Sequence, residues 1–368
     1  MKRLVWIDIS KALAISFVVY FHFFRTVFEH YESPPPDWSG IVAGTVSFLR
    51  AAWWEISGLG FHAVGAFIIL SGWTLMESTA RHAAKGELTW SGWYRARFVR
   101  LYPMYWVAHI VYLVSPCVEK LEPVDSRIIL SLLGLRFINI EMNFMYLNAA
   151  WWYFSMLIQF YLIFPLLFWT VRKIGAWPFL IVACFLGFFV RYLFLGPLAQ
   201  NGLWVLGGFA VCRLPEFALG MALAMWHTQS QSRADWFFLR GPGLAAGVLL
   251  YPVALWFYDY SYVFVDFATG TCCFLAIVGL AGLISRATRL AKIISVVGVY
   301  SYGLYLIHQP YVIWLGLRIR PQPIVVFLLT FLIVLVILSV WGTVLEKGTN
   351  NLVSKLLPRR KMPVGSTL

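Results

Sequence analysis

The sequence predicts an all-α polytopic membrane protein with about ten transmembrane helices and both termini in the cytoplasm. Of its 368 residues, 61% are hydrophobic and only 12% are charged, which excludes an ordinary soluble domain. Apolar stretches long enough to cross a hydrocarbon core of about 30 Å recur along the whole chain. Lysine and arginine gather in alternate connections, so the net charge of +13 indicates membrane topology and not nucleic-acid binding.

The apolar stretches follow one another closely, so we expect residues 1–368 to form a single transmembrane domain with no appended soluble domain. The predicted spans cover roughly residues 9–29, 56–79, 101–118, 150–171, 176–196, 205–226, 241–258, 263–285, 293–315 and 323–345. With the N-terminus inside, 19 lysines and arginines lie on the cytoplasmic side and six on the other, which sets the orientation by the positive-inside rule. The connection 30–55 is then an extracytoplasmic loop, and segment 127–148, interrupted by polar residues, is an interfacial or re-entrant piece on the same side.

Prolines recur within or beside these spans, at Pro103, Pro165, Pro215 and Pro310. A proline inside a helix frees a backbone carbonyl, which other protein groups or a wet cavity must satisfy. The sequence therefore predicts several proline-broken helices around an interior cavity.

The first span carries three ionisable residues, Asp8, Lys11 and His22, and such residues inside a membrane span are functional by default. Lys11 and His22 are eleven residues apart, nearly a whole number of turns, so they share one face and lie about 16 Å apart along the axis. Asp8 lies one turn before Lys11, within reach of its ammonium group. The structural alternatives are that Lys11 extends to the membrane surface and that His22 makes an interhelical hydrogen bond.

Two further groups of charges lie in or near the spans. Arg97 and Arg100 are three residues apart where the third span leaves the cytoplasm, so on a helix they can grip one polyanion together. Such arginines also occur on inner loops without any ligand, and a topological role is the alternative. Arg213 and Glu216 lie at membrane depth, either as a structural ion pair or as part of a site.

The motifs of several enzyme classes are missing from the sequence. It contains no G-x-S-x-G, no H-E-x-x-H, no Walker A motif and no G-x-G-x-x-G followed by an acidic residue, which argues against a hydrolase, a metalloprotease or a nucleotide-driven pump. We expect no bound metal ion. The remaining candidates for a chemical role are His22, the arginines Arg97 and Arg100, and His308. His308 is the alternative to His22 as the general base.

Six stretches of the sequence together resemble acyltransferase family 3, the polytopic bacterial enzymes that O-acylate surface polysaccharides and related glycans. The first, IDISKALAISFVVYFH (7–22), is similar to the opening of the family, with Lys11 and His22 at the family's spacing. The others follow in the family's order: FIILSGWTL (67–75), RFVRLYPMYW (97–106), WYFSMLIQFYLIFPLL (152–167), RLPEFALGM (213–221) and SYGLYLIHQP (301–310).

The resemblance implies an acyl-CoA donor, in the first place acetyl-CoA, and a hydroxyl acceptor on a polysaccharide or lipid-linked glycan, in the bacterial inner membrane and with no permanently bound cofactor. CoA carries phosphates and is made in the cytoplasm, so the basic inner face is its expected entrance. The implied catalytic residues are His22, as general base or transient acyl carrier, and Asp8. The implied donor-binding residues are Lys11, Arg97, Arg100 and Tyr102, and the further candidates are Ser71, Glu141, Arg213, Glu216, Tyr302 and His308.

Two positions depart from the family's pattern. Leu157 and Ile158 stand where the family usually has an acidic residue, and Gly65 stands where an aspartate is often found. The role of those carboxylates is absent here or is supplied by another residue, with Glu141 and Glu216 as the candidates.

Two other classes of function also fit intramembrane charges and broken helices. One is a carrier for an anionic solute or a lipid-linked glycan, and the other is a non-catalytic membrane subunit or sensor. Dependence on added acyl-CoA separates the enzyme from both of them.

Overall fold

The computed structural model describes residues 4–28, 41–115, 124–260, 262–319 and 323–357, and within these ranges every regular element is helical. The α-helices are α1 (Val5–Val27), α2 (Ile41–Ala84), α3 (Trp90–Val114), α4 (Arg127–Leu132), α5 (Ile140–Met145), α6 (Trp152–Ile174), α7 (Ala176–Leu195), α8 (Leu214–Gln229), α9 (Gln231–Leu239), α10 (Pro242–Tyr260), α11 (Val265–Ile284), α12 (Thr288–Val299), α13 (Ser301–Gly316) and α14 (Ile324–Leu356). Short 3-10 or π-helical turns are η1 (Arg136–Ile138), η2 (Ala149–Trp151), η3 (Trp204–Gly208) and η4 (Ala210–Arg213).

Several of these helices are long and apolar enough to cross a membrane. Within the described ranges there are six: α1, Gly44–Ala84 of α2, Ala149–Ile174, α7, α11 and α14. Two bent pairs, α9 with α10 and α12 with α13, raise the number to eight if each pair is one span. The all-helical, multi-pass fold is therefore confirmed, whereas the count of about ten spans and the cytoplasmic termini stay predictions.

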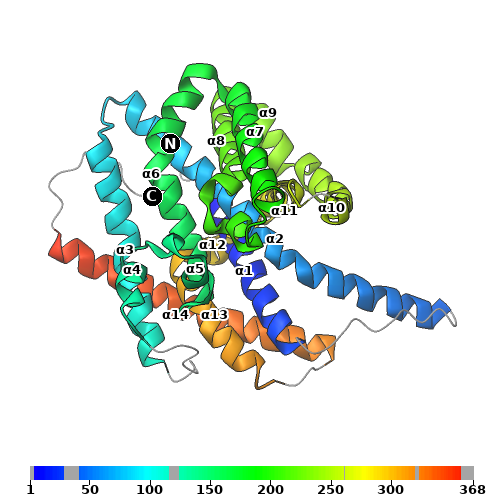
Figure 1. Ribbon diagram of the computed structural model, residues 1–368. Coiled ribbons are helices and arrows are strands. Elements are labelled where there is room, and N and C mark those ends of the chain that lie inside the picture. Colours follow the sequence, from blue (N-terminus) through cyan, green and yellow to red (C-terminus); the bar gives the residue numbers. More distant parts are fainter. Residues whose placement is uncertain (1–3, 29–40, 116–123, 261, 320–322, 358–368) are drawn as a thin grey trace.

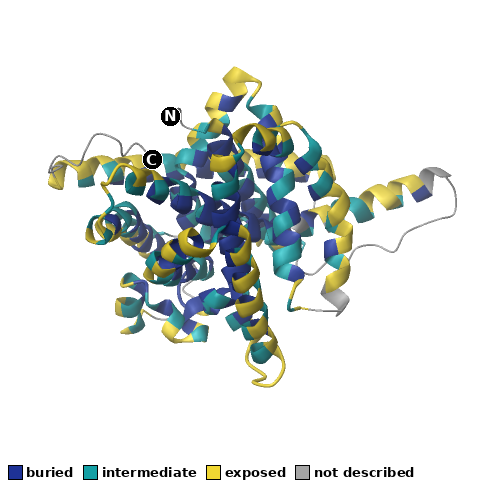
Figure 2. Cartoon of the chain, turned by 90° about the horizontal axis from the view of Figure 1, so that it is seen from above, coloured by how far each residue is buried: buried dark blue, intermediate teal, exposed yellow. Residues whose placement is uncertain are grey.

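The first span lies at the centre of the bundle, where α1 packs against α2, α11, α12, α13 and α14. Its residues Ile9, Ala14, Ile15 and Val19 are fully buried, and Figure 2 shows the buried residues gathered in the middle of the molecule. Because α1 touches so many helices, its residues Asp8, Lys11 and His22 are buried or partly buried among other protein groups.

The prediction that helices break at proline is wrong for the four prolines named above. α3, α6 and α13 continue through Pro103, Pro165 and Pro310. Pro215 lies in the first turn of α8, where the missing N–H would have no partner within the helix anyway.

The surroundings of Pro310 explain why α13 stays whole. A proline at this position removes the hydrogen bond to the carbonyl four residues earlier, that of Leu306. This oxygen instead accepts hydrogen bonds from Trp151 Nε1 at 2.9 Å and Asn148 Nδ2 at 3.1 Å. Side chains from η2 and from the residue before it thus satisfy the freed carbonyl, and the helix has no need to open.

The helix breaks occur at other positions. The predicted span 205–226 is divided into η3, η4 and α8, with Phe209 in an extended conformation between the two short turns. The predicted span 293–315 bends by 72° between α12 and α13. Part of the predicted loop 30–55 is helical, because α2 begins at Ile41 and runs for 44 residues. Its N-terminal part projects away from the other helices (Figure 1).

Aromatic rings pack around the end of α1 that follows His22. The Phe24 ring lies 5.2 Å from the Trp53 ring of α2 and 6.1 Å from the Phe327 ring of α14, measured between centroids. Phe28 lies 5.4 Å from Trp53 and 5.3 Å from Phe327. These rings join α1, α2 and α14 at this end of the bundle.

Glycine lets α2 and α8 come into backbone contact, since a Cβ at Gly72 would overlap the main-chain oxygen of Phe217. We expect Gly72→Ala to lower the free energy of unfolding by about 1–3 kcal/mol, because the two helices must move apart. Thermal unfolding of the purified protein in detergent measures this change.

The matched control is Gly58→Ala on the same helix, where an added Cβ would meet nothing within 4 Å. There the better helix propensity of alanine should leave stability unchanged or raise it by up to about 1 kcal/mol. Equal effects at Gly58 and Gly72 would contradict the packing role of Gly72.

Candidate active site

A cavity of about 330 Å³ lies beside α1 in the middle of the bundle. On α1 its lining includes Asp8, Lys11 and His22, which is the helix face that the spacing predicted. Helices α2, α3, α6, α12 and α13 supply the other walls. Eight of the residues predicted for the site line this one cavity: Asp8, Lys11, His22, Ser71, Arg97, Arg100, Tyr302 and His308.

Four predicted site residues lie outside the cavity lining. Tyr102 lies two residues beyond Arg100, about 200° around the helix, and its hydroxyl donates to the Leu133 carbonyl at 2.8 Å. Glu141 is exposed on α5. Arg213 and Glu216 belong to a separate buried cluster of charges, described below.

The basic end of the cavity is held in place by neighbouring helices. Arg97 donates from Nη2 to Ser78 Oγ of α2 at 3.3 Å, and its guanidinium group lies over the Trp93 ring at 5.3 Å. Arg100 Nη2 lies 4.0 Å from Glu346 Oε1 of α14. Both arginines therefore line the cavity from fixed positions on α3, as their spacing of three residues predicted.

A polar stripe on α2 runs from Ser71 to this end of the cavity, and all of it except Ser71 was missed in the sequence. Ser71, Thr74, Ser78 and Arg81 recur at steps of three, four and three residues, so they share one helix face, and all four line the cavity. Glu77 also lines it. Helical periodicity, extended from the Ser-Gly motif of the second span, would have found the stripe.

The other end of the cavity holds two histidines. The rings of His22 on α1 and His308 on α13 lie 5.3 Å apart between centroids, with their planes at 44°. His308 is fully buried, and its Nδ1 lies 2.7 Å from the Tyr305 carbonyl oxygen. The two candidate bases are thus neighbours, so they belong to one site and are not alternatives far apart in the fold.

Hydroxyl groups of serine and tyrosine also line the cavity. The Ser71 and Tyr153 hydroxyls are hydrogen-bonded at 3.0 Å. The Tyr305 hydroxyl donates to the Ala150 carbonyl at 2.5 Å and accepts from the Phe154 amide at 3.1 Å. Tyr305 therefore ties α13 to the start of α6 beside the histidine pair.

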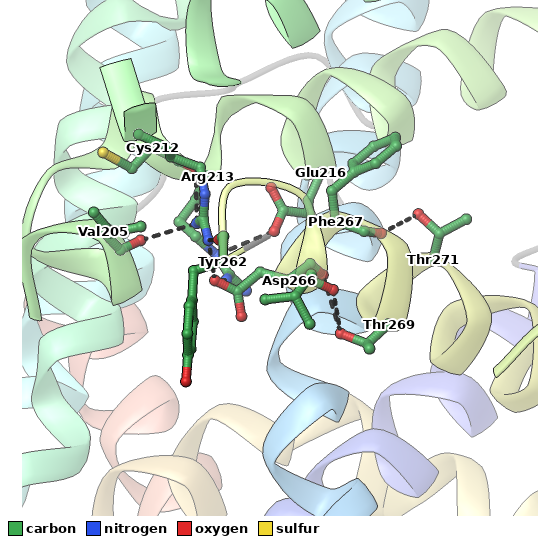
Figure 3. Close-up of polar contacts among 11 residues, drawn as sticks. Val205, Cys212, Arg213, Glu216, Tyr262, Asp266, Phe267, Thr269 and Thr271 are labelled. Carbon is green, nitrogen blue, oxygen red and sulfur yellow. Dashed lines mark hydrogen bonds and ion pairs between the residues drawn. The ribbon is translucent and has the colours of Figure 1, made fainter. Parts of the chain in front are cut away.

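Four buried charges form a second cluster outside the cavity (Figure 3). Asp266 Oδ2 lies 2.8 Å from Arg191 Nη2 and 2.8 Å from Arg213 Nη1, and Arg213 Nε lies 3.2 Å from Glu216 Oε1. Two cations thus face two anions in a balanced network that ties together α7, η4, α8 and α11. The sequence suggested only the Arg213–Glu216 pair, although Arg191 was also recognisable as a charge at membrane depth.

The missing aspartate at Gly65 has a steric explanation. A Cβ at Gly65 would lie 2.6 Å from the Gly270 Cα of α11, so an aspartate does not fit while α2 and α11 touch. Asp266 lies one turn before Gly270 on α11, its main-chain oxygen is 3.5 Å from the Cβ position at Gly65, and its carboxylate pairs with Arg191 and Arg213.

The other departure from the family's pattern, at Leu157 and Ile158, changes the cavity wall itself. Leu157 lines the cavity, so the wall is apolar where the family usually has an acidic residue. The carboxylates in the lining are those of Asp8 and Glu77, and neither Glu141 nor Glu216 is among them.

The cavity combines basic groups that can bind an anion with imidazole groups that can exchange a proton or carry an acyl group. Among the described residues, no group of three or more His, Cys, Asp or Glu side chains is arranged to hold a metal ion.

Comparison with known proteins gives one match. No curated protein and no solved structure matches the chain. A family model described as an acyltransferase domain matches residues 4–345. The chain therefore belongs to acyltransferase family 3, the family that its six motifs resemble, and it is a multi-pass membrane acyltransferase.

Proposed function

We propose that the protein transfers an acyl group, in the first place acetyl, from cytoplasmic acyl-CoA to a sugar hydroxyl of a surface or exported polysaccharide or a lipid-linked glycan. The observation that carries this proposal is the lining of one cavity by Lys11, Arg97 and Arg100 together with His22 and His308. Coenzyme A has phosphates at one end and a thioester at the other, so basic groups and imidazoles in one cavity suit both ends of this donor.

His22 is the proposed reactive side chain. As a general base it takes the proton of the acceptor hydroxyl while the oxygen attacks the thioester carbonyl carbon. The carbon–sulfur bond then breaks, and the thiolate leaves with the electron pair and takes up the proton. As an acyl carrier, the ring would instead attack the thioester and pass the acyl group to the hydroxyl in a second step.

The proposed location is the inner membrane of a bacterium, with both termini and the 80–100 connection in the cytoplasm. The distribution of lysine and arginine supports this orientation. A cysteine placed at Lys85 should react with a membrane-impermeant thiol reagent only after the inner face is exposed. Labelling from the outer face of intact cells would contradict the orientation.

The arginines should govern donor affinity if they hold the CoA phosphates. We expect Arg97→Lys or Arg100→Lys to weaken acetyl-CoA binding at least tenfold, since lysine lacks the planar guanidinium group and a charge-assisted contact is worth about 1.5–3 kcal/mol. Isothermal titration calorimetry with acetyl-CoA measures the dissociation constant.

Arg95→Ala is the matched control, because Arg95 is exposed on the same helix and is not part of the cavity lining. It should bind acetyl-CoA as the unaltered protein does. Unchanged affinity after replacing both Arg97 and Arg100 by alanine would leave these residues with a topological role only.

Two measurements test the function as a whole. In proteoliposomes, the protein should consume acetyl-CoA only when a glycan acceptor is present. In the host, mass spectrometry of the glycans should show the loss of an acyl-sized mass when the protein is deleted and its return with the unaltered protein but not with His22→Ala. Transport of a glycan or anion without acylation would instead favour a carrier.

A further inference from the structure

The hydrogen bond of His308 determines which of its ring nitrogens carries the proton. Nδ1 lies 2.7 Å from the Tyr305 carbonyl oxygen, and a carbonyl can only accept. In the neutral ring the proton is therefore on Nδ1, and Nε2 is left with a lone pair.

That lone pair lacks a partner. His308 Nε2 is buried and makes no hydrogen bond within the described part of the chain. Buried polar atoms are normally hydrogen-bonded, so an unsatisfied one beside a cavity needs an explanation. The neighbouring ring of His22 offers it, because its centroid lies only 5.3 Å from that of His308.

His22 itself is not held by other side chains. Among the hydrogen bonds found between described residues, none involves a ring nitrogen of His22, and the ring lines the cavity. A rotation of this ring is required to bring one N–H group to the lone pair of His308, whose ring centroid lies 5.3 Å away. His308 cannot move as easily, since the Tyr305 contacts at Ala150 and Phe154 fix its helix against α6.

We propose that His308 is a positioning residue, which accepts a hydrogen bond at Nε2 from one ring N–H of His22. This inference rests on the proposed function, in which His22 acts on the acyl group. The contact fixes the tautomer of His22, so that its second nitrogen carries the lone pair on the side of the substrates. The chain of contacts runs from the Tyr305 carbonyl through His308 to His22, and it prepares His22 as a base or nucleophile without a proton shift.

The burial of Nε2 argues against His308 as the base itself. A group that removes the acceptor proton must come within hydrogen-bond reach of the hydroxyl, and this nitrogen is closed off from the cavity solvent. The His22 ring lines the cavity and is only partly buried, so a substrate in the cavity can contact it.

Two amide substitutions separate the roles of the two nitrogens. In His308→Gln the amide oxygen lies near the place of Nε2 and can still accept from His22. In His308→Asn the amide nitrogen lies near the place of Nδ1 and can still donate to Tyr305, but nothing reaches His22. We expect His308→Asn to lower kcat for acyl transfer about 10–100-fold, the cost typical of losing a group that orients a histidine, and His308→Gln to lose much less.

The tautomer of His22 gives a readout that does not depend on turnover. Protein labelled with 15N-histidine should show one His22 tautomer in the unaltered protein and in His308→Gln, and a mixture in His308→Asn; the signal is assigned by its loss in His22→Ala. His227→Asn is the control, because His227 pairs with Asp235 at 3.1 Å and is not part of the cavity lining.

Each pattern of results has a distinct meaning. Equal losses of transfer in both His308 variants with an unchanged His22 tautomer would overturn the inference and make His308 a base in its own right. A larger loss of acyl transfer in His308→Gln than in His308→Asn would also contradict the inference. It would mean that His308 acts only through its contact with Tyr305. If the unaltered protein transfers no acyl group, the proposed function fails, while the tautomer measurement still decides whether the two rings are paired.

Discussion

Replacing His22 by alanine is expected to lower acyl transfer about 10²–10⁴-fold, the usual contribution of a positioned side chain that moves a proton. His22 lines the cavity that also holds the basic residues, and it is only partly buried, whereas His308 is fully buried. The loss should appear in kcat, whereas acetyl-CoA affinity should be unchanged, because the arginines that would hold the phosphates are untouched.

The comparison is transfer by His22→Ala and His308→Ala at matched expression, with calorimetric titration of acetyl-CoA for each variant. The positioning role of His308 predicts the smaller loss for His308→Ala. Near-normal transfer by His22→Ala would refute the assignment of the chemistry to this residue.

Removing the carboxylate of Asp266 is expected to destabilise the fold by about 3–5 kcal/mol, because Arg191 and Arg213 would then be buried without their shared anion. Asp266 Oδ2 contacts both guanidinium groups at 2.8 Å. Asp266→Ala should therefore unfold at a clearly lower temperature in detergent than the unaltered protein.

The control for this prediction is Asp235→Ala, since Asp235 forms a partly exposed contact with His227 at 3.1 Å. An exposed pair of this kind is worth about 0–1 kcal/mol. If Asp266→Ala kept full thermal stability but lost acyl transfer, the four buried charges would belong to a functional site and not to the framework.

Helical periodicity accounts for the predicted site residues that share one cavity. Lys11 and His22 lie on the cavity face of α1 because that helix runs unbroken from Val5 to Val27. The same reasoning holds for Arg97 and Arg100 on α3. Local spacing determines which residues share a face whenever the helix between them is regular.

The features that sequence reasoning missed depend on contacts between distant segments. The backbone of Asp266 lies beside Gly65 only because α2 and α11 touch at Gly270. Likewise, α13 passes through Pro310 because Trp151 donates to the freed carbonyl of Leu306, which lies 155 residues later in the chain. Neither contact leaves a local pattern, so both require the packed structure.

The packed rings beyond His22 also bear on ion leakage across the membrane. A cavity that admits a charged donor admits water, and a wet path through the whole protein would let protons flow down their gradient. On α1 the cavity lining ends at His22, and the next turns are covered by Trp53 and Phe327. Packed apolar rings of this kind exclude water, so an apolar layer separates the cavity lining on α1 from the end of this helix.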